Sequence, residues 1–272
     1  MNPEQLYSEF LKEAKQYRQQ YEAQIPRLIQ MAKEDAARVE YAKGGKTLHR
    51  GYYFPGLMQD IMVGNINRGR LLRKKMKSPD FCYYFDTSNI LHLCESCDTT
   101  EVILRENDCE LGLTVDSNSR LCTLSQCDSK NSFLQSYKRF RVSASEFSGL
   151  YIENYHLQNG LLTEVEVCDV SVVPEKGASR EIVELSLKKS TLTKQEQDEV
   201  LFGCFFQGLH LIIRLCYDGE KPVSYTIREL PRKTVKEYPF DKNAALSLMQ
   251  WYSMPSTVCK RTQSANRQSR EK

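Results

Sequence analysis

The chain opens with apolar residues at three- and four-residue steps, the spacing of one face of an α-helix. Pro26 interrupts this row, and a second row of the same spacing follows it. The two rows are Leu6, Phe10, Leu11, Ala14, Tyr17, and then Leu28, Ile29, Ala32, Ala36, Val39. Because a missing N–H costs little in a first turn, Pro26 can begin a second helix. We therefore expect a helical pair over residues 1–45, closed by Gly44-Gly45.

From Phe81 the pattern changes to short apolar runs separated by residues that favour tight turns. Each unit reads as a strand, a cluster of Asp, Ser, Asn or Gly, and a second strand. Four such hairpins are predicted: residues 81–85 with 90–97, 109–115 with 121–127, 151–155 with 161–170, and 209–217 with 223–230. Their spacing predicts an antiparallel β-meander over residues 81–230.

Three of the second strands share an internal repeat, in which a leucine is followed six residues later by Cys-Asp. The copies are Leu91 with Cys97-Asp98, Leu121 with Cys127-Asp128, and Leu162 with Cys168-Asp169. In an unbroken strand, even spacing would place each leucine, its second and fourth neighbours and the cysteine on one face. We therefore expect Glu95, Glu164 and Glu166 to project outward, with the aspartates near the strand ends.

The remaining segments complete an α+β architecture. Residues 46–80 form a mixed, basic connecting segment, and Thr193-Lys194-Gln195-Glu196 predicts a short helix to about residue 203. Asp241 can cap an amphipathic helix, which gives a closing C-terminal helix within residues 231–254. The polar, basic tail over residues 255–272 is expected to be disordered.

Composition places the protein among ordinary globular proteins, with 40% hydrophobic and 27% charged residues. No apolar run approaches the roughly 18 residues that span a bilayer, and the start of the chain does not resemble a secretory signal. We therefore expect a cytoplasmic protein without a membrane segment. In that reducing compartment the ten cysteines are expected to be free thiols.

The net charge of +3 conceals an acidic middle region. Residues 81–170 carry 6 Lys/Arg against 14 Asp/Glu, a net charge of −8. Such a surface favours a basic partner. The candidate partner-binding residues are the acids of the repeats: Glu95, Asp98, Asp128, Glu164, Glu166 and Asp169. The alternative is that these acids only keep the sheet soluble and block pairing at its edges.

Catalytic and metal sites find little support in the sequence. Cys94 and Cys97 form a C-x2-C pair, but their odd separation in a strand points them to opposite faces, unlike zinc ligands. The P-loop, the dinucleotide fingerprint and the Gly-x-Ser-x-Gly elbow are absent from the chain. We expect no catalytic residues, no metal and no cofactor, and hence a binding protein rather than an enzyme.

Several hairpins resemble those of bacterial polymorphic-toxin immunity proteins. The resemblance lies within residues 81–230, in Tyr83-Tyr84-Phe85-Asp86-Thr87-Ser88-Asn89-Ile90-Leu91, Gly112-Leu113-Thr114-Val115-Asp116 and Leu215-Cys216-Tyr217-Asp218-Gly219. It implies a cytosolic inhibitor that neutralises a basic toxin domain through a charged sheet face. No binding residue is carried over, because immunity families share architecture without sharing interfaces.

Two alternatives remain open, and the oligomeric state is undecided. The first is a scaffold or assembly protein of a phage or secretion system that oligomerises through its N-terminal helices. The second is nucleic-acid binding through residues 68–77, where Arg68, Arg70, Arg73, Lys74, Lys75 and Lys77 cluster. We disfavour nucleic acid because nothing else in the sequence indicates the reading of bases.

Overall fold

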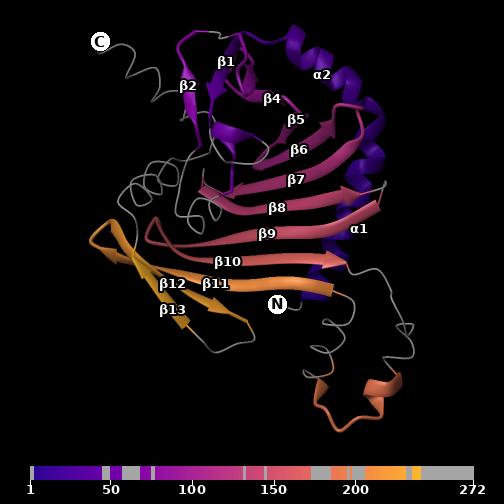
Figure 1. Cartoon of the computed structure of the whole chain (residues 1–272), viewed down its shortest axis with the longest axis vertical. Helices are drawn as coiled ribbons and strands as arrows, with labels where there is room; N and C mark the ends of the chain where they lie inside the picture. Colours follow the sequence, from indigo (N-terminus) through magenta and orange to yellow (C-terminus); the bar gives the residue numbers. More distant parts are fainter. Residues whose placement is uncertain are drawn as a thin grey trace.

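The computed structural model describes residues 3–44, 50–56, 68–74, 77–130, 133–143, 146–172, 185–194, 197, 206–230 and 235–239. Within these residues, thirteen strands form one antiparallel sheet (Figure 1). The strands are β1 (Arg38–Lys43), β2 (Arg70–Leu72), β3 (Phe81–Phe85), β4 (Leu91–Ser96), β5 (Thr99–Glu106), β6 (Cys109–Asp116), β7 (Leu121–Lys130), β8 (Phe133–Ser143), β9 (Glu146–Gln158), β10 (Leu161–Val172), β11 (Phe206–Asp218), β12 (Lys221–Glu229) and β13 (Val235–Pro239).

The predicted β-meander is confirmed. From β3 to β13 each strand pairs with the next one in the sequence, and β1 lies between β3 and β2. All four predicted hairpins form, as the pairs β3–β4, β6–β7, β9–β10 and β11–β12. The strands between them, among them β5 and β8, continue the meander without a crossover.

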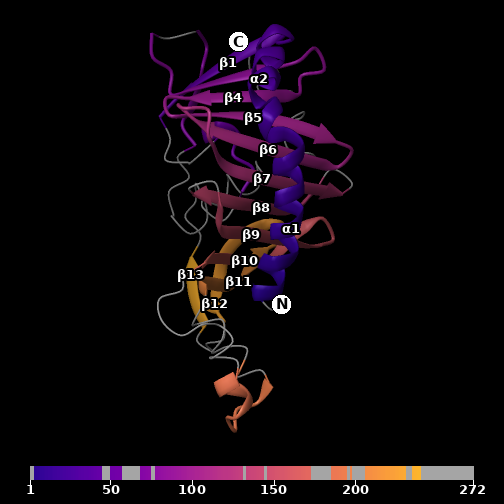
Figure 2. The same ribbon diagram turned by 90° about the vertical axis from the view of Figure 1, so that its right-hand side faces the viewer.

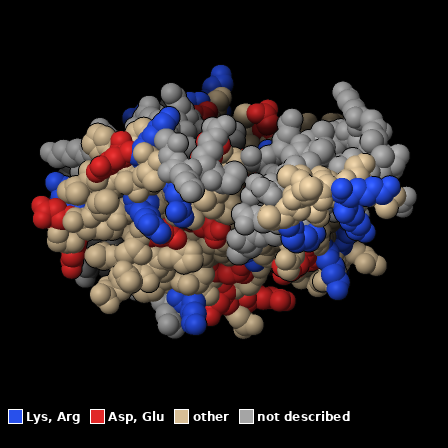
Figure 3. Space-filling view, turned by 90° about the horizontal axis from the view of Figure 1, so that it is seen from below, with Lys and Arg blue, Asp and Glu red and all other residues tan. Residues whose placement is uncertain are grey.

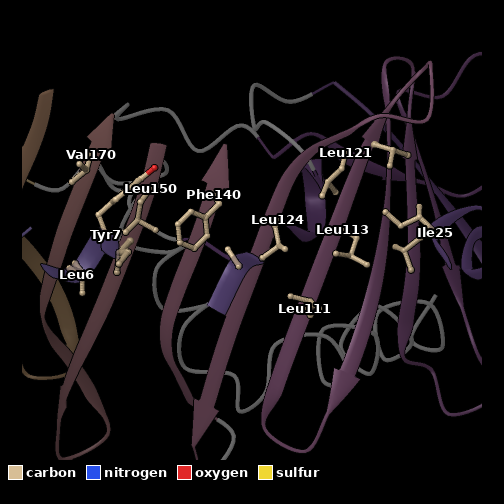
Figure 4. Packing of buried hydrophobic residues seen from close by; sticks show 14 of the residues in the cluster. Leu6, Tyr7, Ile25, Leu111, Leu113, Leu121, Leu124, Phe140, Leu150 and Val170 are labelled. Atoms are coloured by element: carbon tan, nitrogen blue, oxygen red, sulfur yellow. The ribbon is translucent and has the colours of Figure 1, made fainter. Parts of the chain in front are cut away.

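The helices α1 (Pro3–Tyr21) and α2 (Ile25–Glu34), joined by the 3-10 turn η1 (Glu22–Gln24), lie along one face of the sheet (Figures 1 and 2). We call this the helix-covered face. Pro26 lies in the first turn of α2, as predicted. Leu6, Tyr7 and Ile25 are buried against apolar side chains of β4 to β10 (Figure 4). The amphipathic row of the sequence is therefore the row that packs on the sheet.

The prediction that the second helix continues to Val39 is wrong beyond residue 34. α2 ends at Glu34, and Val39, expected on a helix, belongs to β1. There it lies opposite Tyr84 of β3, while Ala42 is fully buried on the other face. Pairing with β3 outweighs the coincidental helical spacing of Ala36 and Val39, and a β-branched residue such as Val39 favours a strand.

The closing helix within residues 231–254 is not observed where the structure describes that range. Residues 235–239 form β13, which pairs with β12. The rest of that range and the tail over residues 255–272 lie outside the described residues. Most of the helix expected to residue 203 does too, although the Gln197 N–H donates to the Thr193 carbonyl at 3.0 Å, as in a first helical turn.

The repeated hairpins carry a feature that the sequence did not indicate. Each second strand has a β-bulge directly after its repeat leucine, at His92, Cys122 and Thr163. A bulge adds one residue, which reverses the alternation beyond it. As a result Leu162 and Cys168 belong to clusters on opposite faces of the sheet, and so do Leu121 and Cys127. The expected single face of leucine, glutamate and cysteine is therefore wrong.

The first two copies share their turn in atomic detail. In one, the Asn89 N–H donates to the Asp86 carbonyl, and the Asp86 side chain accepts the Ile90 N–H at 2.8 Å. In the other, Asp116 accepts from Ser119 and Arg120 in the same way. Asn89 and Ser119 both have φ above +60°. The first two repeat hairpins thus use the same turn, which begins at Asp86 in one and at Asp116 in the other.

Candidate protein-binding surface

The six predicted acids do not form one surface. Glu95, Asp128, Glu164 and Glu166 lie on the helix-covered face, Asp169 lies on the opposite face, and Asp98 lies in the exposed turn between β4 and β5. Figure 3, which views the molecule from the β11–β13 end, shows acidic and basic side chains intermixed. The six predicted acids are therefore not displayed as one acidic patch.

Two of these acids tie structural elements together. Glu95 accepts a hydrogen bond from Tyr84 at 2.6 Å and pairs with Lys33 of α2 at 2.7 Å. Asp169 pairs with Arg141 at 2.8 Å across the opposite face. Such contacts fix the sheet and its helices, a role that neither interpretation of the sequence gave to the acids.

Asp128 has the most partners of the six. It accepts hydrogen bonds from Ser136 at 2.6 Å and Gln126 at 2.7 Å, and pairs with Lys138 at 3.0 Å. Burial alone would raise the pKa of Asp128, but these contacts outweigh it and lower the pKa. The Lys138 ammonium also lies 4.2 Å from the ring centroid of Phe10, so this group fastens α1 to the sheet.

Glu164 and Glu166 are the predicted acids that the fold brings together. They lie two residues apart on β10, facing β11. Glu164 accepts from Arg214 at 2.7 Å, and Glu166 contacts His210 at 2.8 Å. We call these four residues the β10–β11 charged row. Burial tends to raise the pKa of Glu166, but the contact with His210 outweighs it and the pKa is lowered.

The charged row lies where the helical cover ends. The buried cluster beneath α1 and α2 includes Cys168 and Val170 of β10, and among the described residues it includes no side chain of β11, β12 or β13. On that side Arg214 keeps 63% of its side chain exposed, and Cys216 is exposed. All five residues of β13 are exposed.

Exposed large apolar side chains also gather at this end of the sheet. Leu209, Val223, Val235 and Tyr238 belong to β11–β13, whereas Met31, Leu185 and Leu192 lie elsewhere. Val235 lies on the same side of the sheet as the charged row, whereas Leu209 and Tyr238 lie on the opposite face with Leu211 and Tyr225. This end of the sheet thus exposes apolar side chains together with a charged row, and binding sites combine the same two elements. We refer to β11–β13 with the charged row as the terminal surface.

The opposite face is filled by the chain itself. Arg50, which precedes the 3-10 turn Gly51–Tyr53, is 1% exposed and donates twice to Glu101, both at 2.9 Å. It also contacts Glu110, which pairs with Arg105 at 2.6 Å. Burial would raise the pKa of Glu110, but the two arginines lower it to about 2.

This buried charge cluster was missed in the sequence, although one signal for it existed. Gly112 interrupts the apolar run of β6, and an added Cβ there would lie 2.1 Å from Glu101 Oε1. A glycine inside a strand often marks a close approach by another group. Next to the cluster, the guanidinium of Arg68 donates to the Gly56 carbonyl at 3.0 Å. These contacts hold residues 50–56 against the sheet.

The basic segment is divided by the structure. Arg68 is buried, whereas Arg70, Arg73, Lys74 and Lys77 are exposed and Lys75 lies outside the described residues. The N-terminal helices have their apolar residues packed on the sheet, so self-association through that face would require α1 to leave it. Neither observation favours the nucleic-acid or the scaffold alternative over a protein partner.

Other classes of site are also absent from the described part of the chain. No group of three or more His, Cys, Asp or Glu residues there is arranged to hold a metal ion. Cys94 is buried within β4, whereas Cys97 is exposed directly after the strand ends. No helix in the described ranges is long and apolar enough to cross a bilayer. No family model and no curated protein matches the sequence.

Proposed function

We propose that this protein is a non-catalytic binding protein whose terminal surface contacts a folded protein partner. The observation that carries the proposal is the combination, at one end of the described sheet, of exposed apolar residues on β11–β13, the end strand β13, and the charged row on β10 and β11. Apolar residues at the centre of an interface supply affinity, and charged residues around them supply specificity and speed of encounter.

Neutralisation of a basic toxin domain in the cytoplasm is the partner class we favour. Its support is the resemblance of the hairpins to immunity proteins and the exposure of Arg214 in the charged row. Because exposed ion pairs contribute little, of the order of 1 kcal/mol or less, a partner's Arg or Lys can replace Arg214 beside Glu164 at small cost. The two glutamates would then contact the cationic substrate-binding surface of the toxin.

The experiment is co-expression with the product of the adjacent gene, in cells that this product kills when it is expressed alone. Protection by the wild-type chain, with a stoichiometric complex on purification, is expected. The double variant Val235→Ser/Tyr238→Ser should weaken the complex by about tenfold or more, since central apolar residues dominate binding energy. Glu164→Lys/Glu166→Lys should also weaken it, mainly through slower association.

Matched controls separate the terminal surface from general effects of the substitutions. Leu185→Ser/Leu192→Ser removes two exposed apolar residues elsewhere, and Asp98→Lys reverses a predicted acid six strands away from β10. Both should bind like the wild type. If the controls weaken the complex as much as the terminal variants do, or if protection fails while every variant is folded, the proposal is wrong.

A further inference from the structure

A pocket of about 280 Å³ lies between α2, the first hairpin and β5. In Figure 1, α2 and β5 lie at the end of the sheet away from β11–β13. One wall of the pocket includes Met31 and Ala32 of α2 and Asp35, which directly follows the helix. The floor is apolar and includes Val102 and Leu104. The other wall carries two polar side chains, Asp86 and His92. An apolar hollow with a few converging polar groups is the usual form of a small-molecule site.

The bulge of β4 places His92 in this pocket. His92 is the extra residue between Leu91 and Leu93, and its Nε2 lies 3.1 Å from Asp86 Oδ2. Asp86 Oδ1 accepts the Ile90 N–H, so the carboxylate is held from two sides. Bulges commonly re-aim a side chain next to a functional site.

Comparison of the repeat copies shows that the hairpin does not require this histidine. In the second copy the bulge residue is Cys122, whose thiol contacts the Thr114 carbonyl at 3.3 Å. In the third copy it is Thr163, whose hydroxyl donates to the His156 carbonyl at 3.1 Å. Both side chains therefore find a hydrogen-bond partner within their own hairpin. Only in the first copy does the bulge residue meet a carboxylate at the wall of a pocket.

The charges around the pocket indicate the class of ligand. Asp35 and Asp86 supply two carboxylates, and the imidazole of His92 contacts Asp86 at the edge of the pocket. The nearest cation of α2, Lys33, is paired with Glu95 at 2.7 Å, and Arg38 contacts Asn89 and Glu40. The pocket therefore carries an apolar floor with an acidic rim.

We propose that this pocket binds a small amphipathic cation, an apolar body with one protonated amine. At about 30 Å³ per water, the volume corresponds to about nine waters, which fits a ligand of roughly that many non-hydrogen atoms. The body lies on Val102 and Leu104 and the ammonium lies between Asp35 and Asp86. Met31, 42% exposed at the rim, can adapt to the shape of the body.

The test uses phenethylamine as the probe, with phenethyl alcohol and phenylacetate as neutral and anionic analogues of similar size. Binding to the full chain at neutral pH is followed by NMR through the Met31 methyl and the His92 ring protons. We expect saturable shifts of both signals by the amine, with an affinity at least about tenfold above that for phenylacetate. Asp35→Asn should weaken the amine about fivefold, as expected for one half-exposed charge, and leave the alcohol unchanged.

Two further comparisons guard against effects on folding. Asp86→Asn and Asp116→Asn remove the same negative charge in two copies of the hairpin and keep an oxygen that can accept the turn N–H, so only the first should weaken the amine. Ala32→Phe should fill the pocket and abolish the shifts, with an unchanged unfolding midpoint as its control. Equal binding of amine and phenylacetate would overturn the proposal. So would an absence of shifts at Met31 and His92 in the folded wild-type protein, whatever the variants do.

Discussion

Replacing Arg50 by methionine tests whether the buried charge cluster holds residues 50–56 on the sheet. The change keeps a long side chain but leaves Glu101 and Glu110 buried without their central cation. Glu110 retains Arg105 at 2.6 Å, whereas Glu101 retains the hydroxyl of Ser125, at 3.2 Å. Breaking a buried ion pair by removing one partner costs about 3–5 kcal/mol. We expect Arg50→Met to lower the free energy of unfolding by that amount at pH 7.

The pH dependence of this loss follows from the sign of the shifts. In the wild type the pKa of Glu110 is lowered from 4.5 to about 2, so its stabilisation is present above pH 4.5 and is lost as the pH falls towards 2. At 1.36 kcal/mol per unit, this shift corresponds to an order of 3 kcal/mol. In the variant Glu110 keeps Arg105 but loses Arg50, so less of this stabilisation is present and less of it is lost as the pH falls below 4.5.

The assay is urea unfolding of the wild type and the variant at pH 7 and at about pH 3.5. The difference in unfolding free energy between wild type and variant should be smaller at the lower pH, and Arg50→Met/Glu101→Gln should recover much of the loss at pH 7, because the orphaned charge is then removed. Arg70→Met, at an exposed arginine of β2, is the matched control. The reasoning would be refuted if Arg50→Met lowered the free energy of unfolding by less than about 1 kcal/mol. It would also be refuted if the difference between wild type and variant did not change with pH.

Three other predictions address the fold and the alternatives. Gly112→Ala should lower the free energy of unfolding by about 1–3 kcal/mol or more, because the new Cβ would overlap Glu101 and Ser125. Gly160→Ala should lower it only by the strain of a left-handed alanine, about 1–2 kcal/mol. Equal losses in thermal unfolding would show that the close approach at Gly112 is unimportant. Amide hydrogen exchange should be slowest in β5–β10 and fast in β13, which pairs with one neighbour, β12, among the described strands. Slow exchange in β13 would contradict this topology. Affinity for single-stranded DNA should stay in the non-specific range of about 10⁻⁴–10⁻⁶ M at physiological salt, and a tighter complex lost in Arg73→Ser/Lys74→Ser would revive the nucleic-acid alternative.

Turn chemistry is the part of the fold that was predictable from the sequence. Asp86 and Asp116 each precede a left-handed residue and accept backbone N–H groups two to four residues on, so the local residues alone determine these turns. The alternation in β11 was equally readable, since Leu211 and Ile213 are buried on one face and Arg214 is exposed on the other. Both signals come from neighbours in the chain.

The faces of the repeat strands and the charge cluster depend on contacts that local sequence does not contain. A bulge at Cys122 or Thr163 reverses the face of all residues beyond it, and no residue type demands it there. Arg50 meets Glu101 from 51 positions away in the sequence, so only the fold brings them together. The grouping of Glu166 with Asp169 failed for a local reason, since residues three apart in an unbroken strand lie on opposite faces.

Hydrogen exchange on the complex with the adjacent-gene product tests the central claim, that the terminal surface is the site of partner binding. The account predicts that protection on binding falls on residues 206–230 and 235–239 and on Glu164 to Glu166, and leaves α1 unchanged. Protection confined to α1, α2 or the exposed end of residues 68–77 would contradict it.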